Sequence, residues 1–169
     1  HTIDDFGQRF VCNHSDPARH VLFEQRYLQR NPALAAPPAL ISIATEGPAA
    51  PVFRRSPPEP WRIVRTRWRL AGKVKGPIEH GGAVMGYFTS ATGITLYRGT
   101  SLQDSDGNLF VGDVASNLVH RKHLSSSGAT LRATRRDAQR EFLTSTDIWF
   151  RPTNFANGPD GALYICDMY

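Results

Sequence analysis

Five polar residues of this chain could combine proton transfer with anion binding. His120 and Arg121 follow one predicted strand, Arg151 and Asn157 precede another, and Asp167 ends that second strand. A histidine titrates near neutral pH and can serve as a base, and arginine offers a planar donor fork to carboxylates. Polar residues at strand ends and in loops are favoured positions for binding sites. We therefore take His120 as the candidate base and the other four residues as its candidate binding partners.

Each of these assignments has a structural alternative. His20 lies seven residues beyond Asn13, as His120 lies seven residues beyond Asp113, so the two histidines occupy equivalent positions. A residue that recurs between repeats is typical of a structural hydrogen bond to a loop. For Arg151, the alternative is an ion pair with Asp167.

A second candidate for chemistry is the arginine-rich segment Trp61–Leu70. From Val64 onward the residues alternate in character, which predicts a strand that presents Arg65, Arg67 and Arg69 on one face. That face would form an anion-binding wall, or alternatively an edge strand protected by its charge. Further on, the glycine pair beside His80 would allow a ligand to approach the backbone closely.

The elements that position these residues are indicated by a repeat. Asp-Gly followed by Leu, an aromatic and a β-branched residue occurs at residues 105–113 and 157–167, and a degenerate copy occupies residues 6–13. The aligned glycines are Gly7, Gly107 and Gly161, so the spacings are 100 and 54 residues. A unit of about 50 residues with four strands is typical of a β-propeller blade.

The remaining sequence fits an all-β fold. Helix signals are scarce, and Arg135–Leu143 is the one segment that could carry two helical turns. Residues 31–61 hold eight of the twelve prolines and are expected to form an extended insertion, with a strand-like piece at Leu40–Ile43. We predict a partial β-propeller of about three four-stranded antiparallel blades, with residues 1–169 as a fragment of one domain. Since closed propellers typically need four to eight blades, we expect a longer parent chain.

Composition excludes several classes. The formal net charge of +5 comes from 17 Arg against three Lys, and the arginines are spread along the chain, which predicts no nucleic-acid partner. The chain contains no apolar run of 18 residues, so no transmembrane helix is predicted. Cys12 and Cys166 belong to no CxxC pattern, so we expect two small half-buried strand residues rather than a zinc site; a disulfide is the alternative.

Four stretches carry a family resemblance: FGQRFVCNHSDPARHVLFEQRYLQRNP, TGITLYRG, GNLFVGDVASNLVHRKHL and EFLTSTDIWFRPTNFANGPDGALYICDMY. Together they resemble the bacterial membrane-bound dehydrogenase domain. This is a β-propeller family similar to glucose/sorbosone dehydrogenases, and some of its members are PVC-type haem-binding CxxCH proteins. In that family the chain continues past the Asp-Met-Tyr, which implies that this chain is truncated.

The resemblance implies an exported, periplasmic or extracellular quinoprotein-like dehydrogenase of sugars or alcohols. Its cofactor would be pyrroloquinoline quinone, with His120 as the catalytic base and Arg121, Arg151, Asn157 and Asp167 binding the cofactor. Electrons would pass to a c-type haem domain outside this chain. The histidine motif of the sugar dehydrogenases is not visible here, so a non-catalytic propeller that binds carbohydrate or protein is the alternative. No metal site is predicted.

Overall fold

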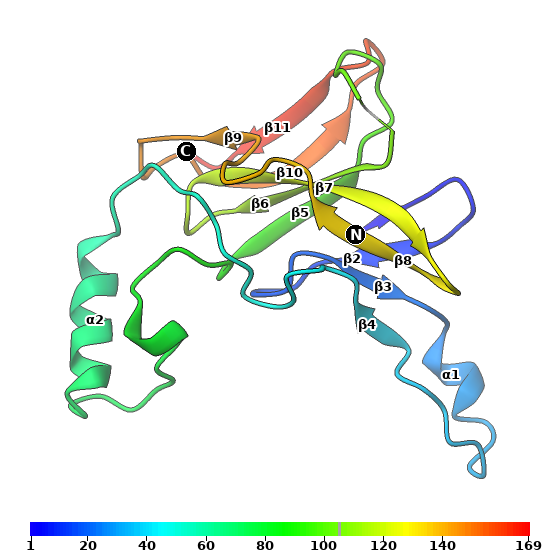
Figure 1. Ribbon diagram of the computed structural model, residues 1–169, viewed down its shortest axis with the longest axis horizontal. Helices are drawn as coiled ribbons and strands as arrows, with labels where there is room; N and C mark the ends of the chain where they lie inside the picture. The colour runs from blue at the N-terminus through cyan, green and yellow to red at the C-terminus, as the bar shows by residue number, and fades with distance from the viewer. Residues whose placement is uncertain (105) are drawn as a thin grey trace.

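The computed structural model describes residues 1–104 and 106–169 and shows a chain dominated by antiparallel strands (Figure 1). The strands are β1 (Thr2–Ile3), β2 (Arg9–Val11), β3 (Arg19–Val21), β4 (Leu40–Ser42), β5 (Ala91–Leu96), β6 (Asn108–Asp113), β7 (Leu118–Ser127), β8 (Thr130–Arg135), β9 (Leu143–Thr144), β10 (Pro152–Asn157) and β11 (Leu163–Asp167). The helices are α1 (Gln25–Leu28), α2 (Pro60–Leu70) and the single 3-10 turn η1 (His80–Gly82). The prediction of an all-β chain is confirmed.

The strands form three sheets. Sheet 1 has the order β1-β2-β3-β4, and sheet 2 has the order β5-β6-β7-β8, with β9 paired to the start of β7. Strands β10 and β11 form a separate hairpin. All these pairings are antiparallel, and none of the sheets described closes on itself. A run of four consecutive antiparallel strands therefore occurs twice.

Sheet 2 lies between the other two sheets and carries the core on both faces. Alternate residues of a strand face opposite sides of its sheet. On β6, Leu109 and Val111 pack with Phe10 of β2 in one buried cluster, whereas Phe110 packs with Phe155 of β10 in another. Figure 1 shows the same order of layers, with sheet 1 and the β10–β11 hairpin on opposite sides of sheet 2. The three layers are held together by these two apolar clusters.

The predicted repeat is present in the backbone. Gly7, Gly107 and Gly161 all have positive φ angles, of 80°, 64° and 82°, and each lies one or two residues before a strand. Glycine adopts this conformation without the steric cost that other residues incur. The predicted turn-and-strand stretches are confirmed by β6 and β11; Ser105, the first residue of the stretch 105–113, lies outside the described residues.

The ends of the repeated strands also match. The Asn13 Oδ1 atom accepts hydrogen bonds from the backbone N–H groups two and three positions further on, at 3.3 and 2.9 Å. The Asp113 Oδ1 atom accepts the equivalent pair at 3.0 and 3.2 Å. Both side chains thus form the turn of a hairpin, β2–β3 or β6–β7, by the same local hydrogen bonding.

The segment Trp61–Leu70 is a helix, so the predicted strand is wrong. Pro60 occupies the first helical turn, where its fixed φ angle is favourable and its missing N–H group is not needed. Arginine and leucine are good helix formers. Arg65, Arg67 and Arg69 alternate, but Arg62, Arg65 and Arg69 have the spacing of one helical face. The apolar residues and the arginines therefore segregate around a helix instead of across a strand.

The one predicted helix, Arg135–Leu143, is also wrong. Arg135 ends β8, Leu143 begins β9, and the residues between them form turns and loop. Two carboxylates of this loop pair with side chains of β7: Asp137 with Arg121, and Glu141 with His120. These tertiary contacts outweigh the weak helical preference of a polar segment.

The proline-rich insertion behaves as expected in its first part. Residues 31–39 form no helix or strand, and β4 follows at Leu40–Ser42, where a strand-like piece is predicted. With α1, this segment projects from the body of the molecule (Figure 1). After β4, backbone hydrogen bonds connect Ile43 and Thr45 to Ala133 of β8, at 2.8 and 3.1 Å, which joins the end of sheet 1 to sheet 2.

The two cysteines are both free. Cys12 is half-buried at the end of β2, as expected, but Cys166 of β11 is exposed. No helix among the described residues has the length and apolar character needed to cross a membrane.

Candidate anion-binding cleft

His120 is buried near the start of β7, and its side chain is only 1% exposed. Its Nδ1 atom lies 2.6 Å from the Glu141 Oε2 atom, and its ring packs edge-on against Phe88. Burial lowers the pKa of His120 even though Glu141 favours the charged form, so the imidazole is neutral and donates through Nδ1. The Nε2 atom is buried and has no hydrogen-bond partner among the described residues. His120 thus resembles a general base in its pairing, but it is sealed from solvent.

Glu141 is the centre of this buried network. One carboxylate oxygen accepts from His120, and the other accepts from the Arg135 guanidinium at 3.0 Å and from the Phe53 N–H at 2.9 Å. Burial acts to raise the pKa of Glu141, but the hydrogen bond from His120 and the nearby positive charge lower it overall. The carboxylate is therefore ionised and fixes three segments of the chain at one point.

A second ion pair, between a buried lysine and a more exposed glutamate, lies two residues further along β7. The Lys122 ammonium is fully buried and 2.6 Å from the Glu46 carboxylate. Burial lowers the pKa of Lys122, although Glu46 opposes that change. Because Glu46 follows β4, this ion pair holds the end of sheet 1 against sheet 2.

The buried histidines lead us to expect that acid destabilises the protein. Burial lowers the pKa of both His20 and His120 below the ordinary value of 6.5. The unfolded chain therefore binds protons first as the pH falls, and the free energy of unfolding should decline below about pH 6.5. Urea denaturation at a series of pH values measures this slope. Asp113, whose pKa is raised by burial, acts in the opposite direction.

The control is His20→Asn, which keeps a polar atom for the bond that His20 Nδ1 makes to Thr130 Oγ1 at 2.8 Å. It should make the decline between neutral and mildly acidic pH shallower. A wild-type protein that is equally stable across this range would contradict the assignment of neutral, buried histidines.

The predicted arginines already have partners. The Arg121 guanidinium binds Asp137 through two hydrogen bonds of 3.0 and 2.8 Å. The Arg151 guanidinium donates to Glu59 at 3.1 Å. Since neighbouring residues of a strand face opposite sides, Arg121 and His120 do not share a site. Neither arginine offers a free charge near the buried histidine.

The last two predicted residues have structural contacts. Asn157, at the end of β10, donates to the Leu96 carbonyl at 3.0 Å and accepts the Arg98 N–H at 3.0 Å, which ties β10 to β5. Asp167 accepts the backbone N–H of Arg151 at 2.7 Å, so these two residues are joined through the backbone rather than as an ion pair. The contacts join Arg151 to Asp167, whereas His120, Arg121 and Asn157 each bind a different part of the chain.

A different group of arginines lines a cleft between α2 and residues 77–90. Arg62, Arg65 and Arg69 are spaced so that they lie on one face of α2. Together with His14 and Glu79 they line a cavity of about 320 Å³. A cavity with three guanidinium groups in its wall is suited to an anion.

The charges of the cleft are only partly neutralised. Arg62 donates to Glu59 at 3.0 Å, but Glu59 also binds Arg151. Partial burial acts to raise the pKa of Glu59, but the two arginines outweigh it and lower the pKa overall. No carboxylate among the described residues lies within ion-pair distance of Arg65 or Arg69, and their buried Nε atoms have no acceptor. Arg69 also donates to the Pro77 carbonyl at 3.3 Å, so its other N–H groups and those of Arg65 are the donors left for an anion.

The wall opposite α2 contains Glu79, and Tyr87 and His80 lie next to it in an adjoining cavity. The Tyr87 hydroxyl donates to Glu79 at 3.1 Å, and burial together with the Glu79 charge raises the pKa of Tyr87. The His80 ring stacks on Tyr87 with centroids 4.0 Å apart. His80 has a φ angle of 45°, which a non-glycine residue adopts only when its surroundings hold it there. This adjoining cavity, of about 260 Å³, shares Glu79 and His14 with the cleft.

Sequence reasoning identified part of this cleft. Arg65 and Arg69 belong to the predicted anion-binding wall, and both line the cavity. Arg67 lies on another side of α2, and Arg62 was missed because it breaks the alternation expected of a strand. The helical spacing 62, 65 and 69 was the signal that could have located all three.

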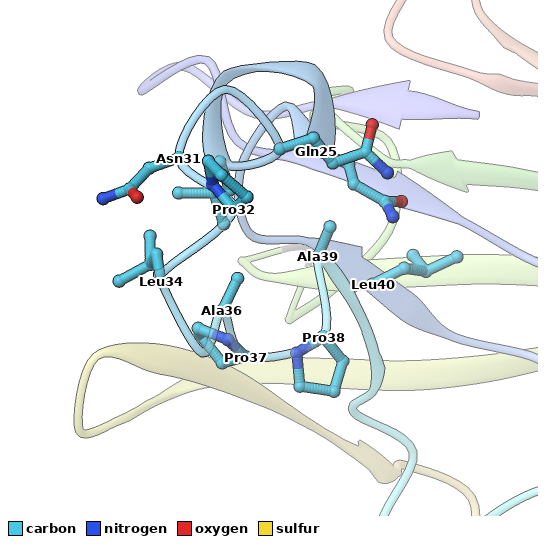
Figure 2. A pocket seen from close by; sticks show the side chains of 11 residues that line it. Gln25, Asn31, Pro32, Leu34, Ala36, Pro37, Pro38, Ala39 and Leu40 are labelled. Atoms are coloured by element: carbon cyan, nitrogen blue, oxygen red, sulfur yellow. The ribbon is translucent and has the colours of Figure 1, made fainter.

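Two larger cavities lie elsewhere. One, of about 640 Å³, lies in the proline-rich projection and is shown in Figure 2; its wall holds Leu34, Pro37 and other uncharged residues. The other, of about 790 Å³, lies near the turn between β1 and β2 and includes Asp4 and Asp5. Asp4 accepts hydrogen bonds from its own turn, and Asp5 pairs with Arg98 at 3.0 Å. Neither cavity presents free cationic donors of the kind found at α2.

The comparisons with known proteins give one match. Neither a curated protein nor a solved structure matches the chain. The sequence model of one domain family, described as a domain of unknown function, DUF7133, matches residues 1–169. Because that match covers the whole chain, the protein belongs to the DUF7133 family.

Proposed function

We propose that this chain is a non-catalytic, propeller-type binding module whose cleft at α2 takes a ligand with carboxylate or phosphate groups. The observation that carries the proposal is the pair Arg65 and Arg69, which line the cavity without a carboxylate partner among the described residues. Guanidinium groups bind carboxylates and phosphates through two parallel hydrogen bonds. An anion that fills the cavity would supply the charged acceptor that these two arginines lack; the Pro77 carbonyl, which accepts from Arg69, is neutral.

The propeller part of the proposal is supported by the repeat. Two consecutive four-stranded antiparallel units lie face to face, and the same glycine and turn-forming residue recur in both at a spacing of 100 residues. The hairpin β10–β11 carries a third copy of the glycine and follows in the next layer. Successive blades of a propeller have this relationship.

The binding role is also supported by where the cleft lies. Its walls are a helix and a loop outside the sheets. The loop is held in place because Tyr87, Phe88 and Thr89, just before β5, are buried, and the Thr89 N–H group donates to the Asp113 carboxylate of β6 at 3.2 Å. Loops held by a rigid framework are common positions for binding sites. Arg62 is anchored to this framework through Glu59 and Arg151, so the start of α2 is held in place before a ligand arrives.

Calorimetric titration with citrate and with inorganic phosphate measures the affinity of the cleft for anions. Arg65→Gln and Arg69→Gln should each weaken binding by about tenfold or more, because a charge-assisted hydrogen bond contributes about 1.5–3 kcal/mol. Arg65→Lys should retain part of the affinity, since it keeps the charge but loses the donor fork.

The matched control is Arg67→Gln, on the same helix but outside the cavity lining. It removes the same charge and should leave the affinity nearly unchanged. Equal loss in all three glutamine variants would indicate non-specific attraction to a basic helix. The absence of binding by either anion would contradict the proposal.

The second candidate is the quinoprotein-like sugar or alcohol dehydrogenase. It is favoured by the His120–Glu141 pair, because a carboxylate orients a histidine that acts as a base. Because His120 is buried, the protein would have to open locally before a substrate could reach the Nε2 atom. Sugar-dependent dye reduction after addition of pyrroloquinoline quinone would favour this candidate over a binding module.

A further inference from the structure

The segment from Pro60 to Ile78 is strongly basic. It contains six cations and no acidic residue: Arg62, Arg65, Arg67, Arg69, Lys73 and Lys75. The last two are exposed in the loop that follows α2, and Arg67 is exposed on α2 itself. These three cations lie outside the lining of the anion-binding cleft, so that cleft does not account for them.

The same segment exposes large apolar side chains. Trp61, Val64 and Trp68 follow the spacing of one helical face and are 50%, 41% and 50% exposed. Leu70, Val74 and Ile78 continue the set and are also exposed. Six of the sixteen exposed large hydrophobic residues among the described residues therefore lie within eighteen positions. Such a concentration marks an interaction surface.

The helix is placed so that this surface is free. None of its residues is fully buried, and its main neighbour is η1 rather than a sheet. Figure 1 shows α2 at the margin of the molecule, away from the three sheets. An isolated eleven-residue helix is marginal in water, so an apolar face left in solvent lacks the packing that usually stabilises such a helix.

We propose that α2 and the loop after it dock onto an anionic lipid surface. A helix with indole rings and aliphatic residues on one face, flanked by arginines and lysines, suits the boundary between headgroups and acyl chains. Trp68 and Val64 would enter that boundary, and Arg67, Lys73 and Lys75 would bind the headgroups. An acidic protein would satisfy the cations but would not need the exposed Trp68 indole beside them. Trp61 is stacked against Arg62 and Arg65 and also lines the cleft. The helix would lie along the surface, since its eleven residues are about half of the length that a transmembrane helix needs.

Co-sedimentation of the purified protein with vesicles tests this. Vesicles of phosphatidylcholine mixed with phosphatidylglycerol should bind it, and vesicles of phosphatidylcholine alone should bind it at least about tenfold more weakly. Brominated lipid should quench the fluorescence of the bound protein through Trp68. The variants Trp68→Ser and Arg67→Gln/Lys73→Gln/Lys75→Gln should each lower vesicle binding by about tenfold or more.

The controls separate this surface from the cleft. Trp149→Ser removes an indole of similar exposure elsewhere and should leave vesicle binding unchanged. The Arg67/Lys73/Lys75 variant should still bind citrate, so failure of one proposal does not imply failure of the other. Binding to soluble poly-glutamate without binding to vesicles would overturn the lipid assignment, as would equal binding to neutral and anionic vesicles.

Discussion

Glu141→Ala should lower the free energy of unfolding by about 3–5 kcal/mol. The Glu141 side chain is fully buried and accepts hydrogen bonds from His120, Arg135 and the Phe53 backbone. Without it, His120 and the Phe53 N–H group lose their acceptor. The Arg135 guanidinium, which is 13% exposed, loses its carboxylate and keeps only the Arg140 and Pro51 carbonyls. Removing one partner of a buried charged network leaves the others unpaired, which is far more destabilising than losing a surface ion pair. Urea denaturation measures the effect.

The matched control is Glu24→Ala. Glu24 pairs with Arg9 at 3.5 Å, and both side chains are 48% exposed. Exposed pairs of this kind contribute about 0–1 kcal/mol. If the two alanine variants lost similar amounts of stability, the buried network would not be the anchor that links β7, β8 and the segment before α2.

Gly93→Ala should separate the β10–β11 hairpin from sheet 2. A Cβ atom at Gly93 would lie 2.6 Å from the Asn154 Cα atom and 2.9 Å from the Thr153 carbonyl oxygen. Both contacts are to backbone, so no side chain can move aside, and β10 must shift away from β5. The φ angle of 58° adds about 1–2 kcal/mol for a residue with a Cβ atom. Hydrogen exchange of the β10 amides should show the hairpin opening.

Gly128→Ala isolates the steric part of this effect. Gly128 has a similar φ angle of 61° in the turn between β7 and β8, but nothing lies within 4 Å of its Cβ position. This variant should lose the conformational cost alone and leave β10 protected. If the β10 amides lost the same protection from hydrogen exchange in both variants, the close approach of β10 to β5 would not be needed for the layered arrangement.

The parts of the fold that the sequence predicted are those determined locally. A glycine with a positive φ angle before a strand, and an Asn or Asp that binds its own turn after it, depend on residues within a few positions. The repeat of Gly7 and Gly107, with Asn13 and Asp113, was therefore detectable without knowing the fold. The strand at Leu40–Ser42 was found in the same way, from a short β-branched and aliphatic run.

The helix α2 was not predicted because its arginines fit the period of a strand as well as that of a helix. Arginines at alternating positions indicate a strand, but Arg62, Arg65 and Arg69 also share a helical face. Pro60 was counted with the proline-rich insertion, although a proline directly before a run of helix formers is typical of a first helical turn. The predicted anion-binding wall was wrong at one position for the same reason: it included Arg67, whereas the cleft is lined by Arg62.

The role of Glu141 could not be read from its neighbours in sequence. Its partners His120 and Arg135 lie on two strands, and Phe53 lies 88 positions away. In the sequence, Glu141 sits in a polar run that suits a short helix, and only the packing of β7 against this loop reveals its use. The network that gives His120 a partner therefore depends on tertiary structure, as does the separation of His120 from Arg121, Arg151 and Asp167.

The most direct test of an anion-binding cleft is a crystal structure of the protein grown with selenate. Selenate is a tetrahedral oxyanion like phosphate, and its selenium gives an anomalous signal that locates it without bias. We expect an anomalous peak between α2 and residues 77–90, within hydrogen-bond distance of the Arg65 and Arg69 guanidinium groups. Selenate bound elsewhere on the molecule with that cleft empty would contradict it.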